Sequence, residues 1–224
     1  MTVLFVLLTF AAFLALDAWS HRNEPVRVAA LASEREEPEP MRLEPVWVAG
    51  FQVPDGLHFH RGHTWARLAG NDTVVVGIDD FARRLIGPAT RAALPKAGTW
   101  LNQGQPAAKL GLDGREVNLV APVEGEVIET NPLLEQQPGA ATTDPYGRGW
   151  LYKVRSTEIG RNLTNLLSGS LAHRFIEDSR ERLQLQLMTL SGSVLADGGE
   201  PSPDFARHLP DEDWRRLTRE FLLS

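Results

Sequence analysis

The sequence predicts a mainly β domain with short helices, preceded by a transmembrane helix and followed by a helical C-terminal extension. Between residues 46 and 167, many short apolar runs are separated by Gly and Pro turns, which is typical of a small β-sandwich or barrel. An unbroken apolar run stands at the N-terminus, and leucines recur at helical spacing between residues 162 and 190. These three patterns define the expected organisation of the chain.

Residues 1–20 are predicted to anchor the chain in a lipid bilayer. Residues 3–16 contain one polar residue, Thr9, and Asp17 is the only charged side chain before residue 21. A helix of about 20 apolar residues is long enough to cross the roughly 30 Å hydrocarbon core. The alternative is a cleaved signal peptide, although no Lys or Arg precedes the run. By the positive-inside rule, the arginines that follow predict a single-pass membrane protein whose globular part is cytoplasmic: Arg22, Arg27 and Arg35.

Composition divides the rest of the chain into three segments. Residues 21–45 are rich in Glu and Pro and are predicted to form an extended linker. Residues 46–167 form the predicted globular domain, and residues 168–224 form the predicted helical extension. The extension ends in an apolar stripe that we expect to dock on the domain, with a foreign partner as the alternative: Trp214, Leu217 and Phe221.

Within the domain, the hairpin between residues 109 and 130 has the clearest local signal. Asp113 and Gly114 separate two apolar runs, and this dipeptide favours a type I′ turn because both central positions need positive φ. Residues 73–78 predict a β-branched strand, and residues 81–87 predict a short amphipathic helix.

The composition excludes several classes of function. The chain has 224 residues, a formal net charge of −6 and no cysteine, which excludes thiolate sites and argues against nucleic acid as the main partner. Asp79 and Asp80 form a carboxylate pair in sequence, but capping of the helix accounts for at least one of them. Three neighbouring histidines favour a structural or surface role over a metal site: His58, His60 and His63. We therefore predict no catalytic residue, no metal and no enzyme activity.

Five motifs give the domain a recognisable pattern. They are aromatic-x-x-x-His-x-Trp at 59–65, V-G-I-x-D-x-A at 76–82, L-P-x-x-G at 94–98, A-P-V-x-G-x-V at 121–127 and D-P-Y-G-x-G-W-L at 144–151. In this order they make the stretch from residue 59 to about residue 167 resemble the glycine cleavage H-protein family. That resemblance implies a lipoyl-type barrel-sandwich hybrid, in which family members carry lipoate on a lysine.

The sequence departs from the family at the hairpin that carries lipoate. Family members have E-S-V-K-A there, whereas counting back from Ala121 places residues 111–115, GLDGR, at these positions. Gly114 then occupies the position of the lipoyl-lysine. Arg115 cannot replace it as an acyl acceptor, because its guanidinium stays protonated. We therefore predict that the domain binds no cofactor.

The other lysines of the chain are poor substitutes for a lysine at the hairpin tip. Lys109 lies about five residues before the tip and Lys153 falls within a predicted strand, whereas a swinging arm needs an exposed turn. Lys96, beside Gly98, is the best placed of the three.

The predicted function follows from two expectations. The domain keeps the fold of the family, and the residues at the position of the lipoyl-lysine hairpin are replaced. We expect a membrane-anchored, non-lipoylated, H-protein-like domain that acts as a binding or scaffold subunit of a larger membrane-associated complex. Its partners would be other protein subunits and, through residues 1–20, the lipid bilayer. The first alternative is a lipoate-dependent acyl or aminomethyl carrier modified at another lysine. The second is a single-pass assembly factor that binds its partner through the N-terminal helix.

Overall fold

The computed structural model describes residues 45–191 and 209–223. The chain divides into two units, Met1–Arg42 and Leu43–Ser224, and all described residues belong to the second unit. The predicted anchor at residues 1–20 and all but the last residue of the predicted linker at residues 21–45 lie outside the described residues.

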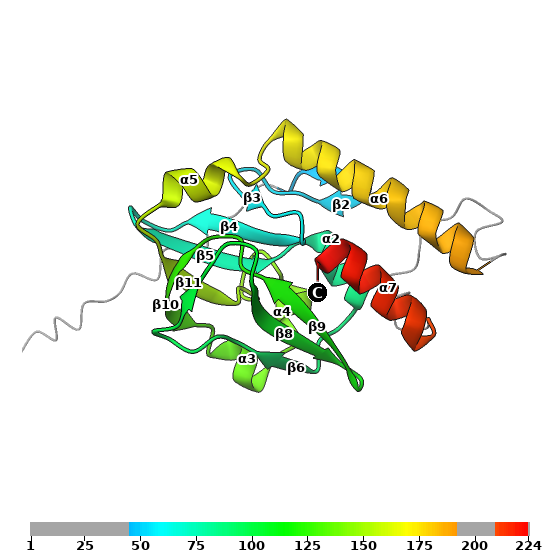
Figure 1. Ribbon diagram of the computed structural model, residues 1–224, viewed down its shortest axis with the longest axis horizontal. Helices are drawn as coiled ribbons and strands as arrows, with labels where there is room; N and C mark the ends of the chain where they lie inside the picture. The colour runs from blue at the N-terminus through cyan, green and yellow to red at the C-terminus, as the bar shows by residue number, and fades with distance from the viewer. Residues whose placement is uncertain (1–44, 192–208, 224) are drawn as a thin grey trace, which may run out of the picture. The chain divides into compact units, whose positions relative to one another are not determined.

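The body of the described unit is an antiparallel, mainly β structure with short helices, as the sequence predicts. Its largest sheet has six strands (Figure 1), in the order β3 (His58–Phe59), β4 (Thr64–Leu68), β5 (Thr73–Ile78), β11 (Tyr152–Arg155), β10 (Gly125–Thr130) and β7 (Trp100–Leu101).

The remaining strands of the described residues form two smaller sheets. The three-stranded sheet has the order β6 (Arg91–Ala93), β8 (Pro106–Leu112) and β9 (Arg115–Val120). A two-stranded ribbon is formed by β1 (Trp47–Val48) and β2 (Phe51–Gln52). The predicted hairpin at residues 109–130 is therefore β8, β9 and β10, with β10 crossing into the larger sheet.

Six helices are described. They are α2 (Asp80–Ile86), α3 (Leu133–Gln136), α4 (Ala140–Thr143), α5 (Ile159–Thr164), α6 (Ser170–Ser191) and α7 (Asp211–Leu222). The helix predicted at residues 81–87 is α2, and the helical pattern at residues 162–190 is α5 and α6, with Gly169 at positive φ between them. The one-turn helices α3 and α4 lie between β10 and β11, in a stretch for which no helix is predicted above.

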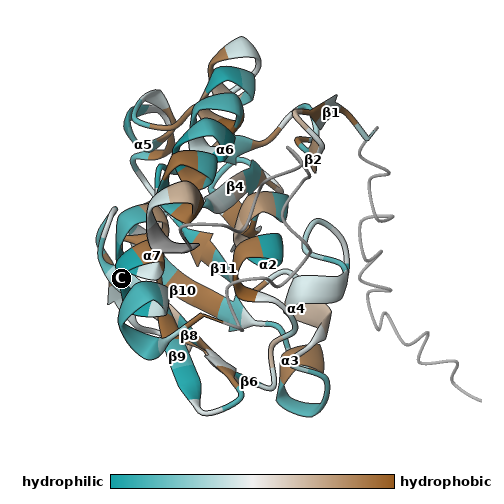
Figure 2. Cartoon of the chain, turned by 90° about the vertical axis from the view of Figure 1, so that its right-hand side faces the viewer, coloured by the Kyte–Doolittle hydropathy of each residue, from teal (hydrophilic) through white to brown (hydrophobic). Residues whose placement is uncertain are grey.

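Close packing between β4 and β5 explains one motif of the sequence. Gly77 lies opposite Trp65 in the ladder, and a Cβ on Gly77 would overlap the Trp65 indole. The indole N–H donates to the Ile78 carbonyl at 2.8 Å, so the ring lies flat across β5 and is buried. The glycine of the V-G-I motif is therefore required because the tryptophan of the His-x-Trp motif packs directly against it. Figure 2 shows the hydrophobic residues concentrated on the central strands, including β10 and β11.

The predicted location, a single-pass membrane protein with a cytoplasmic globular part, is wrong. In residues 45–191 and 209–223, no helix is both long enough and apolar enough to cross a membrane. The longest of these helices, α6, has 22 residues but carries six charged side chains between residues 174 and 182. They include Arg174, Glu177, Asp178, Arg180, Glu181 and Arg182, and placing such groups in hydrocarbon is costly.

Candidate functional site

The tip of the β8–β9 hairpin forms the turn that its sequence predicts. Leu112 pairs with Arg115, which leaves Asp113 and Gly114 as the two-residue loop. Their φ angles are 45° and 88°, so both central positions are left-handed, as a type I′ turn requires. A Cβ on Gly114 would meet no atom within 4 Å, so its backbone conformation, and not crowding, is what favours glycine. No lysine lies in this turn.

Arg115, directly after the turn, joins the hairpin to the C-terminal helix. Its Nη2 lies 2.6 Å from the Asp211 carboxylate and donates to the Leu209 carbonyl at 2.9 Å. Its guanidinium carbon also lies 5.5 Å from the centre of the Trp214 ring, within the range of a cation–π interaction. Sequence reasoning weighed Arg115 only as an acyl acceptor and missed this contact.

Helix α7 docks on the body through the apolar stripe that the sequence predicts. Trp214, Leu217 and Phe221 expose 5%, 0% and 2% of their surface, so the prediction of a docked stripe is confirmed. The helix contacts β9, α2 and α6 (Figure 1). Its first turn carries acidic residues at the positive end of the helix dipole, which stabilises the end that Arg115 holds.

A stack of aromatic rings around His63 lies under α6 and α7. The imidazole lies between Phe81, at 4.2 Å, and Phe175 of α6, at 4.8 Å between ring centres. Phe221 of α7 lies 5.2 Å from Phe81. The Nδ1 atom of His63 is 2.7 Å from the Asp79 carboxylate, and both side chains are buried. His63 is therefore a packed core residue that links the body to both C-terminal helices.

The other two histidines have separate surroundings. The Nδ1 atom of His60 accepts a hydrogen bond from the Gly62 N–H at 3.0 Å, and burial, followed by His63 and Arg61, lowers the pKa of His60. Burial also lowers the pKa of His58. In the part of the chain that the structure describes, no three His, Asp or Glu side chains are grouped so that they could hold a metal ion.

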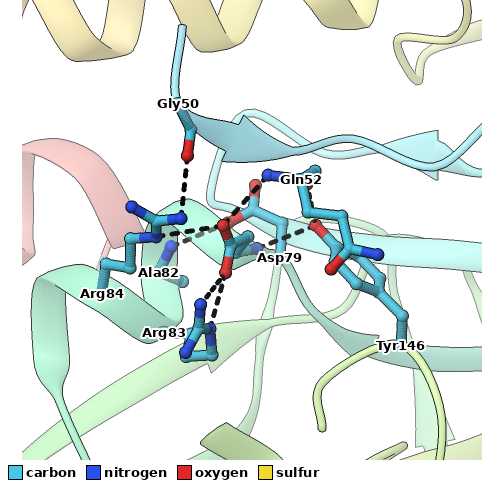
Figure 3. Close-up of polar contacts among 8 residues, drawn as sticks. Gly50, Gln52, Asp79, Ala82, Arg83, Arg84 and Tyr146 are labelled. Carbon is cyan, nitrogen blue, oxygen red and sulfur yellow. Dashed lines mark hydrogen bonds and ion pairs between the residues drawn. The ribbon is translucent and has the colours of Figure 1, made fainter. Parts of the chain in front are cut away.

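The two adjacent carboxylates at the start of α2 have structural partners. Asp79 is the N-cap and accepts from the Ala82 N–H at 2.8 Å, as the capping prediction requires. Asp80 is buried and forms ion pairs with Arg83 and Arg84. Both arginines follow Asp80 within one turn of the helix and are labelled in Figure 3, where dashed lines mark their ion pairs.

Tyr146, from the D-P-Y-G motif, completes this polar network. Its hydroxyl donates to the Gln52 carbonyl at 2.7 Å and accepts from the Asp80 N–H at 2.8 Å (Figure 3). Burial, reinforced by the carboxylates of Asp79 and Asp80, raises the pKa of Tyr146 well above its usual value. The hydroxyl therefore stays protonated and ties β2 to the start of α2, which explains the motif as a structural one.

The three lysines differ in their surroundings. Lys153 is ion-paired with Glu129 at 2.9 Å and lies over the Trp150 ring. Lys109 is exposed within β8, where it pairs with a residue of β6 on one side and of β9 on the other. Lys96 is exposed in a tight turn, in which its carbonyl accepts from the Thr99 N–H at 3.1 Å. Lys96 alone of the three lies in an exposed turn.

Comparison with known proteins matches most of the body to one family. The family model for the glycine cleavage H-protein matches residues 57–179. The probable glycine cleavage system H protein of Thermococcus gammatolerans is 31% identical over 130 residues, which are 58% of this chain and 96% of that protein. The glycine cleavage system H protein of Rubrobacter xylanophilus is 38% identical over 107 residues, covering 48% of this chain and 84% of that protein.

A solved structure gives a similar coverage. The crystal structure of a glycine cleavage system H protein from Mycobacterium marinum is 28% identical, with a TM-score of 0.47, and the match covers 53% of this chain and 94% of that chain. Together with the absence of a membrane-spanning helix from the described residues, the relatives contradict the predicted membrane location. The matched region ends inside α6, so α7 lies beyond it.

Proposed function

Because this chain belongs to the glycine cleavage H-protein family, we propose that it is a member that carries no lipoate and acts as a protein-binding or scaffold subunit. It performs no chemistry of its own. Its role is to present the family's domain, extended by two C-terminal helices, as a recognition surface for other proteins.

The β8–β9 turn is the observation that carries this proposal. An acyl arm needs an amine at an exposed turn, and the turn consists of Asp113 and Gly114. Counting back from Ala121, Gly114 takes the position at which family members carry the lipoyl-lysine. Arg115, the next residue, is already engaged with α7 through Asp211 and Trp214. The hairpin thus has a structural role that replaces the carrier role.

Membership of the family suggests which proteins are candidate partners. The matched relatives are named as H proteins of the glycine cleavage system, so proteins of that system are the first candidates for partners of this chain. The acidic balance of the sequence, with a net charge of −6, supports protein partners over nucleic acid.

The test is co-purification of the full chain from two kinds of cells, one able to synthesise lipoate and one unable to do so. We expect the same proteins to co-purify in stoichiometric amounts from both. Partners that appear only when lipoate is made would contradict the proposal, because binding would then depend on an acyl arm.

The second candidate is a carrier modified at Lys96, and one observation favours it over modification elsewhere. Lys96 is exposed in a turn that Gly98 closes at a φ of 84°, and the Gly98 N–H is fixed to the Val127 carbonyl at 2.7 Å. A rigid base of this kind would hold an arm out from the domain. If this candidate is correct, Lys96→Arg removes an acyl modification from the purified chain, and the matched variant Lys109→Arg keeps it.

A further inference from the structure

A row of side chains crosses the outer face of the six-stranded sheet. Arg67 of β4 lies opposite Val75 of β5, and Val75 lies opposite Lys153 of β11. Lys153 in turn lies opposite Glu129 of β10. Side chains alternate between the two faces of a strand, and Ala66, the residue before Arg67, is fully buried in the core. The side chains of the row therefore share the face that points away from the core.

Arg67 differs from the other basic side chains of this face in having no counter-charge. Lys153 is 2.9 Å from the Glu129 carboxylate, and Arg155, two residues further along β11, is 3.4 Å from the Asp72 carboxylate. Within residues 45–191 and 209–223, no carboxylate forms an ion pair with the Arg67 guanidinium, and no acceptor forms a hydrogen bond with its Nε atom. The sheet thus supplies a carboxylate to Lys153 and to Arg155 but none to Arg67.

The Arg67 guanidinium is also partly withdrawn from water. Its Nε atom is buried, whereas its two Nη atoms keep access to solvent. Burial lowers the pKa of Arg67 from its usual value, but a guanidinium stays protonated in proteins. A partly desolvated charge without a partner lowers the stability of a fold. A residue of this kind therefore indicates a use other than holding the sheet together.

A carboxylate is the group that fits this side chain. A guanidinium can donate two parallel hydrogen bonds to one carboxylate, and partial desolvation strengthens such a pair because the local dielectric constant is low. The accessible Nη atoms of Arg67 leave room for these bonds on the outer side of the sheet.

The surroundings of Arg67 favour a carboxylate that belongs to another protein over a free anion. The Lys153 ammonium lies 4.8 Å from the centre of the Trp150 ring, which brings an aromatic side chain to this face. Trp and Arg are the residue types that contribute most to binding energy at protein interfaces. The net charge of −6 gives the chain no long-range attraction for free anions, so a carboxylate must be brought to Arg67 by further contacts.

We propose that the outer face of the six-stranded sheet binds an acidic surface segment of a partner protein, and that Arg67 receives an Asp or Glu carboxylate of that segment. The ion pairs of Lys153 and Arg155 form the polar rim of this surface. The inference rests on the proposed function, because it assigns the surface through which the binding module recognises its partner. Arg67, Trp150 and Lys153 all lie within residues 57–179, so the surface belongs to the region that the family model matches.

An NMR titration of the full chain with an acidic peptide tests this surface. The probe is acetylated hexaglutamate, and hexaglutamine at the same ionic strength is the neutral control. We expect hexaglutamate to shift the amide signals of β4, β5 and β11 in a saturable manner and hexaglutamine to leave them unchanged. Arg67→Met should weaken the binding by at least about tenfold, because hydrogen bonds to a charged group are lost. Arg155→Met removes a paired cation from the same face and should change it by less than about twofold.

Urea unfolding of the same variants separates a binding role of Arg67 from a structural one. Arg67→Met removes a buried donor without an acceptor and keeps an apolar stem, so its unfolding midpoint should equal or exceed that of the wild type. Arg67→Lys keeps the charge but loses the planar fork. This variant should bind hexaglutamate more weakly than the wild type and more tightly than Arg67→Met.

Several results would overturn the inference. Absence of saturable shifts, or shifts confined to other elements, would exclude this face, and unchanged binding by Arg67→Met would exclude Arg67. A lower urea midpoint for Arg67→Met would make Arg67 a structural residue. The same shifts with sodium acetate at equal carboxylate concentration would assign a site for free anions, and a wild-type dimer that Arg67→Met dissociates would assign a second copy as the occupant. None of these results depends on lipoate, so the proposed function stands or falls separately on its co-purification test.

Discussion

Arg115, the residue directly after the hairpin turn, is ion-paired with Asp211, the first residue of α7, at 2.6 Å. This contact connects the part of the fold from which an acyl arm would project to a helix that lies beyond the family match. The same guanidinium lies over Trp214 and donates to the Leu209 carbonyl. The hairpin is thus engaged in holding α7, and this relationship leads to our first prediction.

Replacing Arg115 by Gln should weaken the docking of α7 by about 1–2 kcal/mol, because it removes a cation–π contact, a charge-assisted hydrogen bond and a partly exposed ion pair. Amide hydrogen exchange should report faster exchange in α7 and unchanged exchange in β4 and β5. Arg216→Gln is the matched control, since Arg216 is exposed on the same helix. Equal protection of α7 in both variants would contradict the role of Arg115.

Replacing Phe221 by Ala should destabilise the docked helix by about 3–5 kcal/mol, because a buried aromatic ring that contacts Phe81 is lost. We expect limited proteolysis to remove α7 while the remaining chain stays folded. Leu223→Ala, at a side chain that is 50% exposed, should leave the proteolysis pattern unchanged. Cooperative unfolding of the whole domain by Phe221→Ala would show that α7 is an integral part of the fold.

Gly114 should tolerate Asn better than Ala. Its φ of 88° lies in the left-handed region, where a non-glycine residue costs roughly 1–2 kcal/mol and Asn is the least penalised. Urea denaturation should give a lower free energy of unfolding for Gly114→Ala than for Gly114→Asn. Equal stability of the wild type and the Ala variant would mean that the turn is not the type I′ turn described above.

Acidification should destabilise the fold partly through His60. The pKa of this residue is lowered from 6.5 in the folded state, so near pH 6 the unfolded chain binds more protons than the folded chain. The free energy of unfolding is therefore unaffected by His60 above pH 6.5 and falls as the pH drops through the folded pKa. Protonation of Nδ1 would also break the hydrogen bond from the Gly62 N–H.

The variant His60→Asn isolates this contribution, because Asn offers an acceptor for the same N–H without titrating. Thermal or urea unfolding at pH 7.5 and pH 5.5 should show a smaller loss of stability for the variant than for the wild type. An identical loss in the two proteins would assign the pH dependence to other groups.

Local patterns were sufficient to predict much of this fold. The Asp113-Gly114 dipeptide predicts the hairpin turn, a β-branched run predicts strand β5, and an N-cap followed by an apolar stripe predicts helix α2. Each of these signals acts over a few residues. The buried stripe of α7 was predicted for the same reason. In contrast, α3 and α4 have four residues each, too few for a helical repeat to appear in the sequence.

The candidate site was less predictable, because its contacts join residues that are far apart in the chain. Arg115 and Asp211 are separated by most of the C-terminal half, and no local pattern of either residue indicates the other. The stack of Phe81, His63 and Phe175 likewise depends on where α6 packs. The wrong prediction of a membrane location arose from the apolar run in residues 1–20, which lie outside the described residues. The composition of that run carries no information about the fold of the body.

The central claim is that this H-protein-family chain carries no lipoate, and the mass of the intact protein tests it most directly. The full chain is produced in cells that lipoylate a family member with a lysine at the hairpin tip, and that protein is purified in parallel as a positive control. We expect the unmodified mass for this chain and an added lipoyl mass for the control. An added lipoyl or octanoyl mass on any of Lys96, Lys109 or Lys153 would contradict the claim.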